Sequence, residues 1–180
     1  MRSINNCSAF TKVIISTTLL LTGGNAVADH QRAGDVLQVL IPAISYGATF
    51  YLDDAQGRSQ FHKSFVTTAG VTQVLKHLVK KKRPNGGGKS FPSGHTSSAF
   101  QGASFVHQRY GLKYALPAYL GAAYVGYSRV ESDNHHVEDV IAGAALGIVT
   151  NLYFTRRHQN YMLSPMVGKN SYGFTIAGQF

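Results

Sequence analysis

Five stretches with almost no charge divide the chain, and their lengths restrict what it can fold into. They cover residues 36–52, 64–74, 95–108, 114–128 and 140–154. Polar loops that contain glycine separate them, so five helices are the economical interpretation. Each stretch is shorter than the ~20 apolar residues that a membrane span usually needs, and each contains Ser, Thr, Gln or Tyr. The pattern therefore predicts an all-α fold class, a compact bundle of about five to six helices, rather than a set of spans.

The first 28 residues follow a different pattern. Arg2 and Lys12 precede the apolar run VIISTTLLL, and small residues lead to Ala28. This order is typical of a secretory signal peptide with its cleavage site. We expect a leader over residues 1–28, a mature chain that begins at Asp29, and export to a bacterial-type periplasm or cell envelope. An uncleaved N-terminal anchor is the alternative. The only cysteine, Cys7, lies in the leader, so no disulfide framework is expected.

Residues 29–180 are long enough for one domain with its own core. Alternating aromatic and apolar residues near the C-terminus predict a short extended tail over about 164–180. The whole chain has a net charge of +9. Without Arg2 and Lys12, 15 basic side chains remain against 8 acidic ones, a net charge of +7. This excess favours phosphates or an anionic membrane surface as partners, and export disfavours nucleic acid. No obligate protein partner is evident.

The basic stretch KHLVKKKRP ends the second predicted helix. Lys76 and Arg83 are close to two helical turns apart, so we expect both on one face of that helix. Pro84 is expected to end the helix at Arg83. For Lys80, Lys81 and Lys82 we prefer a solvated charge run or a polybasic patch that touches anionic lipid. The following NGGGKS lacks the first glycine of a P-loop and is interpreted as a flexible turn.

The stretch FPSGH predicts the start of the third helix. Ser93 is a suitable N-cap for a helix that runs on from about His95. The backbone N–H groups of Ser93, Gly94 and His95 would then point outward as a phosphate cradle. Gly94 lets an oxyanion approach the main chain, and His95 is placed to pass a proton to a leaving oxygen. Taken alone, a histidine at a helix start is more often a capped surface residue.

A third stretch, SRVESDNHHVEDV, adds a second histidine. His135 and Asp139 are four residues apart, so we expect them on one face of a helix capped by Asp133 or Asn134. A carboxylate bonded to one ring nitrogen leaves the other free to attack. Arg129 is a candidate bidentate phosphate clamp. Taken alone, the pair is interpreted by default as a structural salt bridge; His136 and Glu138 are interpreted as structural.

In order, these stretches are Lys-x6-Arg-Pro, Pro-Ser-Gly-His and Ser-Arg-x5-His-x3-Asp, all within residues 76–139. The set resembles the type 2 phosphatidic acid phosphatase superfamily, which is similar in its site to class A acid phosphatases and vanadium haloperoxidases. The resemblance implies a helical bundle, His135 as nucleophile, His95 as general acid and Asp139 as its orienting partner. It also implies a phosphoryl group held by Lys76, Arg83, Ser93, Gly94 and Arg129. The chain is shorter than integral membrane members, and its tail matches nothing in the pattern.

We therefore expect an exported phosphatase that acts on a phosphate monoester or diphosphate through a phosphohistidine. The basic surface and apolar stretches favour a membrane lipid phosphate, namely phosphatidic acid, phosphatidylglycerol phosphate or an isoprenoid diphosphate. A soluble periplasmic acid phosphatase is the main alternative. A vanadate-dependent haloperoxidase and a non-catalytic phospholipid-binding protein are the others. No cluster of metal ligands is seen, so neither a metal nor a cofactor is expected.

Overall fold

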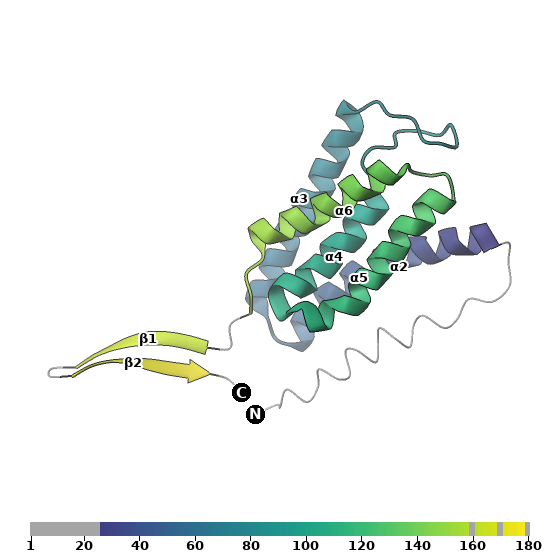
Figure 1. Ribbon diagram of the computed structural model, residues 1–180. Helices are drawn as coiled ribbons and strands as arrows, with labels where there is room; N and C mark the ends of the chain where they lie inside the picture. The colour runs from purple at the N-terminus through teal and green to yellow at the C-terminus, as the bar shows by residue number, and fades with distance from the viewer. Residues whose placement is uncertain (1–25, 159–160, 169–170, 179–180) are drawn as a thin grey trace.

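The computed structural model describes residues 26–158, 161–168 and 171–178. These include five helices: α2 (Ala26–Tyr51), α3 (Ala55–Leu78), α4 (Gly94–Tyr110), α5 (Leu112–Glu131) and α6 (Val137–Phe154). They form one bundle in which α4 contacts each of the others (Figure 1). The predicted all-α class and the five helices are confirmed. The leader lies mostly outside the described residues, and α2 runs through the predicted cleavage segment at Ala26 to Ala28.

Small side chains let the helices pack closely around α4. The core is built largely from alanines, including Ala99, Ala103 and Ala122, which are fully buried. Gly143 and Gly147 face the backbone of α4, and a Cβ at Gly147 would lie 2.6 Å from the carbonyl oxygen of Ser97. Because a side chain at either position would clash with this backbone, the two glycines let α6 pack closely against the first two turns of α4.

The second helix ends earlier than predicted. It ends at Leu78, and Val79 already has an extended conformation. The chain then turns back on itself: Lys82 and Lys89 form an antiparallel bridge, and the Ser90 N–H donates to the Lys81 carbonyl at 2.8 Å. The expectation that Pro84 ends the helix, with Lys76 and Arg83 on one helical face, is therefore wrong. Strand-like pairing within the loop replaces the expected last turn.

A β-hairpin follows the bundle. Strands β1 (Tyr161–Gly168) and β2 (Ser171–Gly178) pair antiparallel, with Tyr161 opposite Gly178. The extended segment begins at Tyr161, slightly before the tail predicted for about 164–180, and the pairing of two strands within it was not predicted. Figure 1 shows the hairpin extending away from the helices.

Candidate active site

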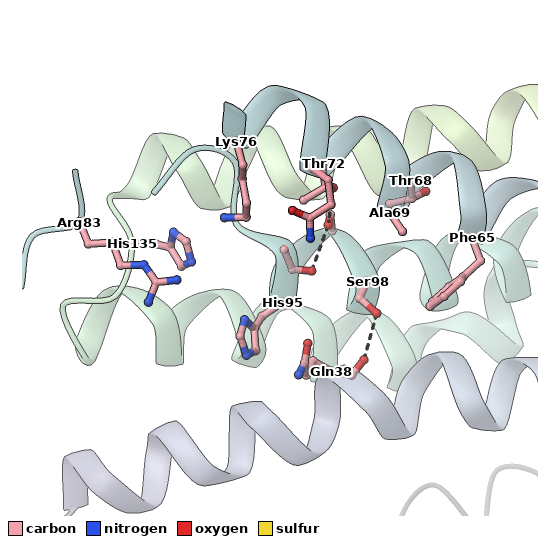
Figure 2. A pocket seen from close by; sticks show the side chains of 13 residues that line it. Gln38, Phe65, Thr68, Ala69, Thr72, Lys76, Arg83, His95, Ser98 and His135 are labelled. Carbon is pink, nitrogen blue, oxygen red and sulfur yellow. Dashed lines mark hydrogen bonds between the residues drawn. The ribbon is translucent and has the colours of Figure 1, made fainter. Parts of the chain in front are cut away.

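The predicted site residues gather at one end of the bundle, where α3 ends and α4 and α6 begin. A cavity of about 320 Å³ lies there, and Lys76, Arg83, Gly94, His95 and His135 line it. Figure 2 shows the rings of His95 and His135 and the guanidinium of Arg83 at the same end of this cavity. A smaller adjoining cavity of about 220 Å³ is lined by His95, His135, Arg83 and Arg129. Three stretches distant in sequence therefore meet around one space.

His135 lies just before α6 and not within it. The helix begins at Val137 and its N-cap is His136, so the predicted cap at Asp133 or Asn134 is wrong. The distance from His135 Nδ1 to Asp139 Oδ2 is 3.9 Å, which is too long for a hydrogen bond. The two residues are neighbours, as the spacing predicted, but the expected hydrogen bond between the carboxylate and the ring nitrogen is absent.

The Asp139 carboxylate is buried and heavily hydrogen-bonded. Oδ1 accepts from Lys81 Nζ at 2.8 Å, and Oδ2 accepts from Ser90 Oγ and from the His136 N–H at 3.0 Å. Burial raises the pKa of Asp139, but the hydrogen bonds from Lys81, Ser90 and His136 outweigh it and lower the pKa to about 2. Asp139 is therefore ionised at neutral pH. The interpretation of Lys81 as part of a solvated, lipid-facing run is wrong, because this lysine binds Asp139 and Glu138.

His135 is neutral at neutral pH. Its side chain is 2% exposed. Burial, followed by the positive charges of Lys76 and Arg83, lowers the pKa of His135 to about 4. A neutral imidazole keeps a lone pair on one ring nitrogen, which is the form that a nucleophile needs.

The helix start at Pro-Ser-Gly-His behaves partly as predicted. Ser93 is the N-cap of α4, and its Oγ accepts from the Thr96 N–H at 3.4 Å. Its own N–H, however, donates to the Asp139 carbonyl at 2.9 Å, so it is not free for a phosphate as predicted. The first N–H groups of an α-helix have no acceptor within the helix, which leaves the amides of Gly94 and His95 for an anion. A Cβ at Gly94 would make ordinary van der Waals contact with Thr72 at 3.7 Å and with Lys76 at 3.8 Å, so packing alone does not require glycine at this position.

Two cations face the cavity with few partners. Arg83 Nε is buried and has no hydrogen-bond partner within the described part of the chain, while its Nη1 reaches Asn134 only at 3.5 Å. Lys76 Nζ reaches the Lys89 carbonyl at 3.5 Å. Burial, followed by repulsion from Arg83, lowers the pKa of Lys76. Repulsion between two weakly paired cations is relieved when an anion binds between them.

Arg129 is present at the site but is already held by α2. Its Nη1 donates to Asp35 at 2.8 Å, and its Nη2 donates to the Gln31 carbonyl at 2.6 Å. Asp35 also lies 3.1 Å from His95 Nε2. Burial and the positive charge of Arg129 lower the pKa of His95, and Asp35 opposes this shift. Asp35 thus contacts both Arg129, the candidate phosphate clamp, and His95, the candidate general acid.

Sequence reasoning missed Ser90 and Asp35 as site residues. Ser90 stands close to the Pro-Ser-Gly-His motif, and this proximity was the one available signal. Asp35 is far from every motif, and nothing in its neighbours marks it. Within the described ranges, no three His, Cys, Asp or Glu side chains are grouped so that they could hold a metal ion.

Comparison with known proteins finds one matching family and several similar proteins. A model of the PAP2 superfamily matches residues 59–163. The lipid A 1-phosphatase of Porphyromonas gingivalis is 31% identical over 109 residues, which are 58% of this chain and 23% of that protein. The lipid A 4'-phosphatase of Helicobacter pylori is 28% identical over 169 residues, which are 83% of this chain and 85% of that protein.

A solved structure has the same fold. The transmembrane PAP2-type phosphatidylglycerolphosphate phosphatase of Bacillus subtilis superposes with a TM-score of 0.57 at 24% identity. The match covers 85% of this chain and 86% of that one. The arrangement of helices is therefore shared across most of both chains.

Proposed function

Because the chain belongs to the PAP2 superfamily, we propose that it is a phosphoric ester hydrolase that removes phosphate from a membrane lipid phosphate. The observation that carries the proposal is the pairing of a buried, neutral His135 with Arg83 and Lys76, two weakly partnered cations, in one cavity. This combination offers a nucleophile and the charge that a phosphoryl group requires.

In the first step, a ring nitrogen of His135 attacks phosphorus and forms a P–N bond while the P–O bond to the leaving alcohol breaks. Lys76, Arg83 and the amides of Gly94 and His95 stabilise the non-reacting oxygens, where negative charge is concentrated. Arg129 retains N–H groups beyond those given to Asp35, Gln31 and Ser128, and adds to this clamp. The leaving oxygen takes a proton from His95.

In the second step, water attacks the phosphohistidine and releases inorganic phosphate. His95 now accepts the proton from that water, because the group that donates in the first step accepts in the second. In the empty site burial and Arg129 lower the pKa of His95. A bound phosphate adds negative charge beside His95, which favours the protonated acid that the first step needs.

Two observations favour a lipid substrate. The named relatives act on lipid A. In addition, α5 exposes Leu112, Leu116 and Leu120 one turn apart, and α6 exposes Val137 and Ile141, so two helices present apolar stripes. We keep phosphatidic acid, phosphatidylglycerol phosphate and isoprenoid diphosphate beside lipid A as candidate substrates. A soluble acid phosphatase remains the second candidate, since the cavity residues alone do not require a lipid.

Phosphate release from a substrate panel tests this function. The panel contains lipid A, phosphatidic acid, phosphatidylglycerol phosphate, an isoprenoid diphosphate and a soluble aryl phosphate, each with and without a chelator. We expect at least one lipid to be hydrolysed faster than the aryl phosphate, inhibition by vanadate, and full activity with chelator. No phosphate release from any member would overturn the proposal, and hydrolysis of the aryl phosphate alone would favour the soluble phosphatase.

We further propose that the exported chain, residues 29–180, lies on the periplasmic face of a membrane. One described helix, Val137–Phe154, is long and apolar enough to cross a bilayer by length and composition, so a spanning helix is the alternative that the extraction experiment tests. The exposed Lys80 and Lys82 add attraction to anionic headgroups that salt screens. We expect high salt with alkaline washing to release the protein, and we expect its intact mass to match a chain that begins at Asp29.

A Lys80→Glu/Lys82→Glu variant should bind anionic vesicles more weakly than the parent.

Extraction by detergent alone would mean that the helices span the bilayer. Recovery of a chain that still begins at Met1 would contradict the leader. The double variant spares Lys81, because that side chain binds Asp139 and its loss would disturb the site.

A further inference from the structure

Ser90 stands between the nucleophile and the carboxylate expected to orient it. Its side chain is fully buried, as is Asp139, and His135 is 2% exposed. Ser90 Oγ lies 3.3 Å from His135 Nδ1 and donates to Asp139 Oδ2. The backbone N–H of Ser90 is held separately by the Lys81 carbonyl at 2.8 Å. The hydroxyl is therefore fixed at a point where it can touch both partners.

The other bonds to Asp139 explain why it does not contact His135 directly. Oδ1 is occupied by Lys81 at 2.8 Å. Oδ2 accepts from Ser90 and from the His136 N–H, and His136 Nδ1 lies 3.2 Å from the same oxygen. A carboxylate oxygen offers about two lone-pair positions, so these donors already occupy Oδ2, the oxygen that lies 3.9 Å from His135 Nδ1. Lys81 holds the other oxygen, and the carboxylate is fixed with Oδ2 unavailable to His135.

The direction of each hydrogen bond follows from the donors present. Ionised Asp139 can only accept, so the single proton of the Ser90 hydroxyl points to Asp139. Ser90 Oγ then has only a lone pair to offer His135 Nδ1. For a hydrogen bond to form between them, Nδ1 must carry the proton and donate it to Oγ. We infer that Ser90 is a positioning residue that fixes His135 in the Nδ1–H tautomer and leaves Nε2 bare for attack on phosphorus.

This assignment rests on the proposed function for its catalytic consequence but not for its geometry. When Nε2 forms the P–N bond, the ring becomes positively charged. The chain from Nδ1–H through Ser90 to Asp139 stabilises that charge without any proton leaving the ring. Ser90 touches neither substrate nor phosphorus, so it acts only through His135.

The tautomer can be measured directly. In protein labelled with ¹⁵N in the histidine rings, we expect His135 to show a protonated Nδ1 and a bare Nε2 at neutral pH, assigned by comparison with His135→Gln. In Ser90→Ala both tautomers should become populated. The kcat should fall about ten- to a hundredfold, the effect of one hydrogen bond to a charged group, while KM changes little. Ser90→Ala/Asp139→Asn should lose little more than Asp139→Asn alone, because the two residues act in one chain.

Ser45→Ala is the matched control. Ser45 is also buried, but its Oγ donates to the Ile41 carbonyl at 2.7 Å, with the Gly102 carbonyl 3.0 Å away, and it lines neither cavity of the site. It should keep the parent tautomer and kcat. If Ser90→Ala folds poorly, Ser90→Cys takes its place. It retains a side chain of similar size with a weaker donor, so its kcat should lie between those of the parent and Asp139→Asn.

Some results would overturn the inference. An Nε2–H tautomer in the parent protein would do so without any variant, as would an unchanged tautomer and kcat in Ser90→Ala. If the parent hydrolyses no phosphate ester, the proposed function fails, but the ring spectra still decide whether Ser90 orients His135.

Discussion

His135→Ala is expected to abolish phosphoenzyme formation with every substrate, however good its leaving group. The variant lacks the only atom proposed to bond to phosphorus, so kcat should fall on the order of 10⁴-fold or more, as for loss of other catalytic nucleophiles. The measurement is rapid quenching with a radiolabelled substrate, followed by a search for acid-labile, base-stable phosphate on the protein. His62→Ala is the control, because His62 is exposed and bonds Tyr46 away from the site. Full activity in His135→Ala would show that the nucleophile is misassigned.

His95→Ala should fail differently from His135→Ala. In the first step the His95 side chain supplies the proton to the leaving oxygen, and an aryl oxide needs that proton far less than an alkoxide does. In His95→Ala the rate of phosphohistidine formation, measured by rapid quenching, should therefore fall much less with an aryl phosphate than with a lipid phosphate. Equal losses in this step on both substrates would indicate that His95 binds the phosphate and does not protonate the leaving group.

The helical fold was predictable because each helix leaves a local signal. A low-charge stretch bounded by polar, glycine-containing loops marks each helix, and Ser93 marks the start of α4 by its capping chemistry alone. These features depend on residues near one another in the chain, where propensity and spacing are informative.

The contacts around the two histidines were less predictable because they join distant segments. Lys81 reaches Asp139 only because the loop before Ser90 folds back through the bridge between Lys82 and Lys89. That fold also ends α3 at Leu78, before the proline that was expected to stop it. Spacing placed His135 and Asp139 together, but the serine between them comes from another loop.

Asp35 shows the same limit more strongly. It joins Arg129 and His95 because α2 lies very close to the end of α5. Gly34 makes this possible, since a Cβ there would lie 2.0 Å from Ser128 Oγ and 2.6 Å from Arg129 Nη2. No local pattern in α2 indicates which residue will face the site.

The end of the bundle opposite the active site depends on a buried ion pair. Arg109, in the last turn of α4, donates through Nε to Asp54 Oδ2 at 2.6 Å, and both side chains are 2% exposed. Asp54 is also the N-cap of α3, and Arg109 Nη1 donates to the Arg156 carbonyl at 2.8 Å. One guanidinium therefore links the start of α3, the end of α4 and the segment after α6. Although burial raises the pKa of Asp54, hydrogen bonds from Arg109 and Gly57 keep the pKa below its ordinary value.

Arg109→Met is expected to lower the free energy of unfolding by roughly 3–5 kcal/mol, because it leaves the Asp54 carboxylate buried without its counter-charge. Unfolding in denaturant, followed by circular dichroism in one fixed detergent, measures the loss. Asp53→Asn is the matched control: its carboxylate is 99% exposed and lies 3.8 Å from Arg58, a surface pair worth about 1 kcal/mol or less. Asp54→Asn/Arg109→Met should recover part of the loss, since asparagine still caps α3 but carries no charge to leave unpaired. If Arg109→Met unfolds within about 1 kcal/mol of the parent, water reaches Asp54 and the pair does not hold this end of the bundle together.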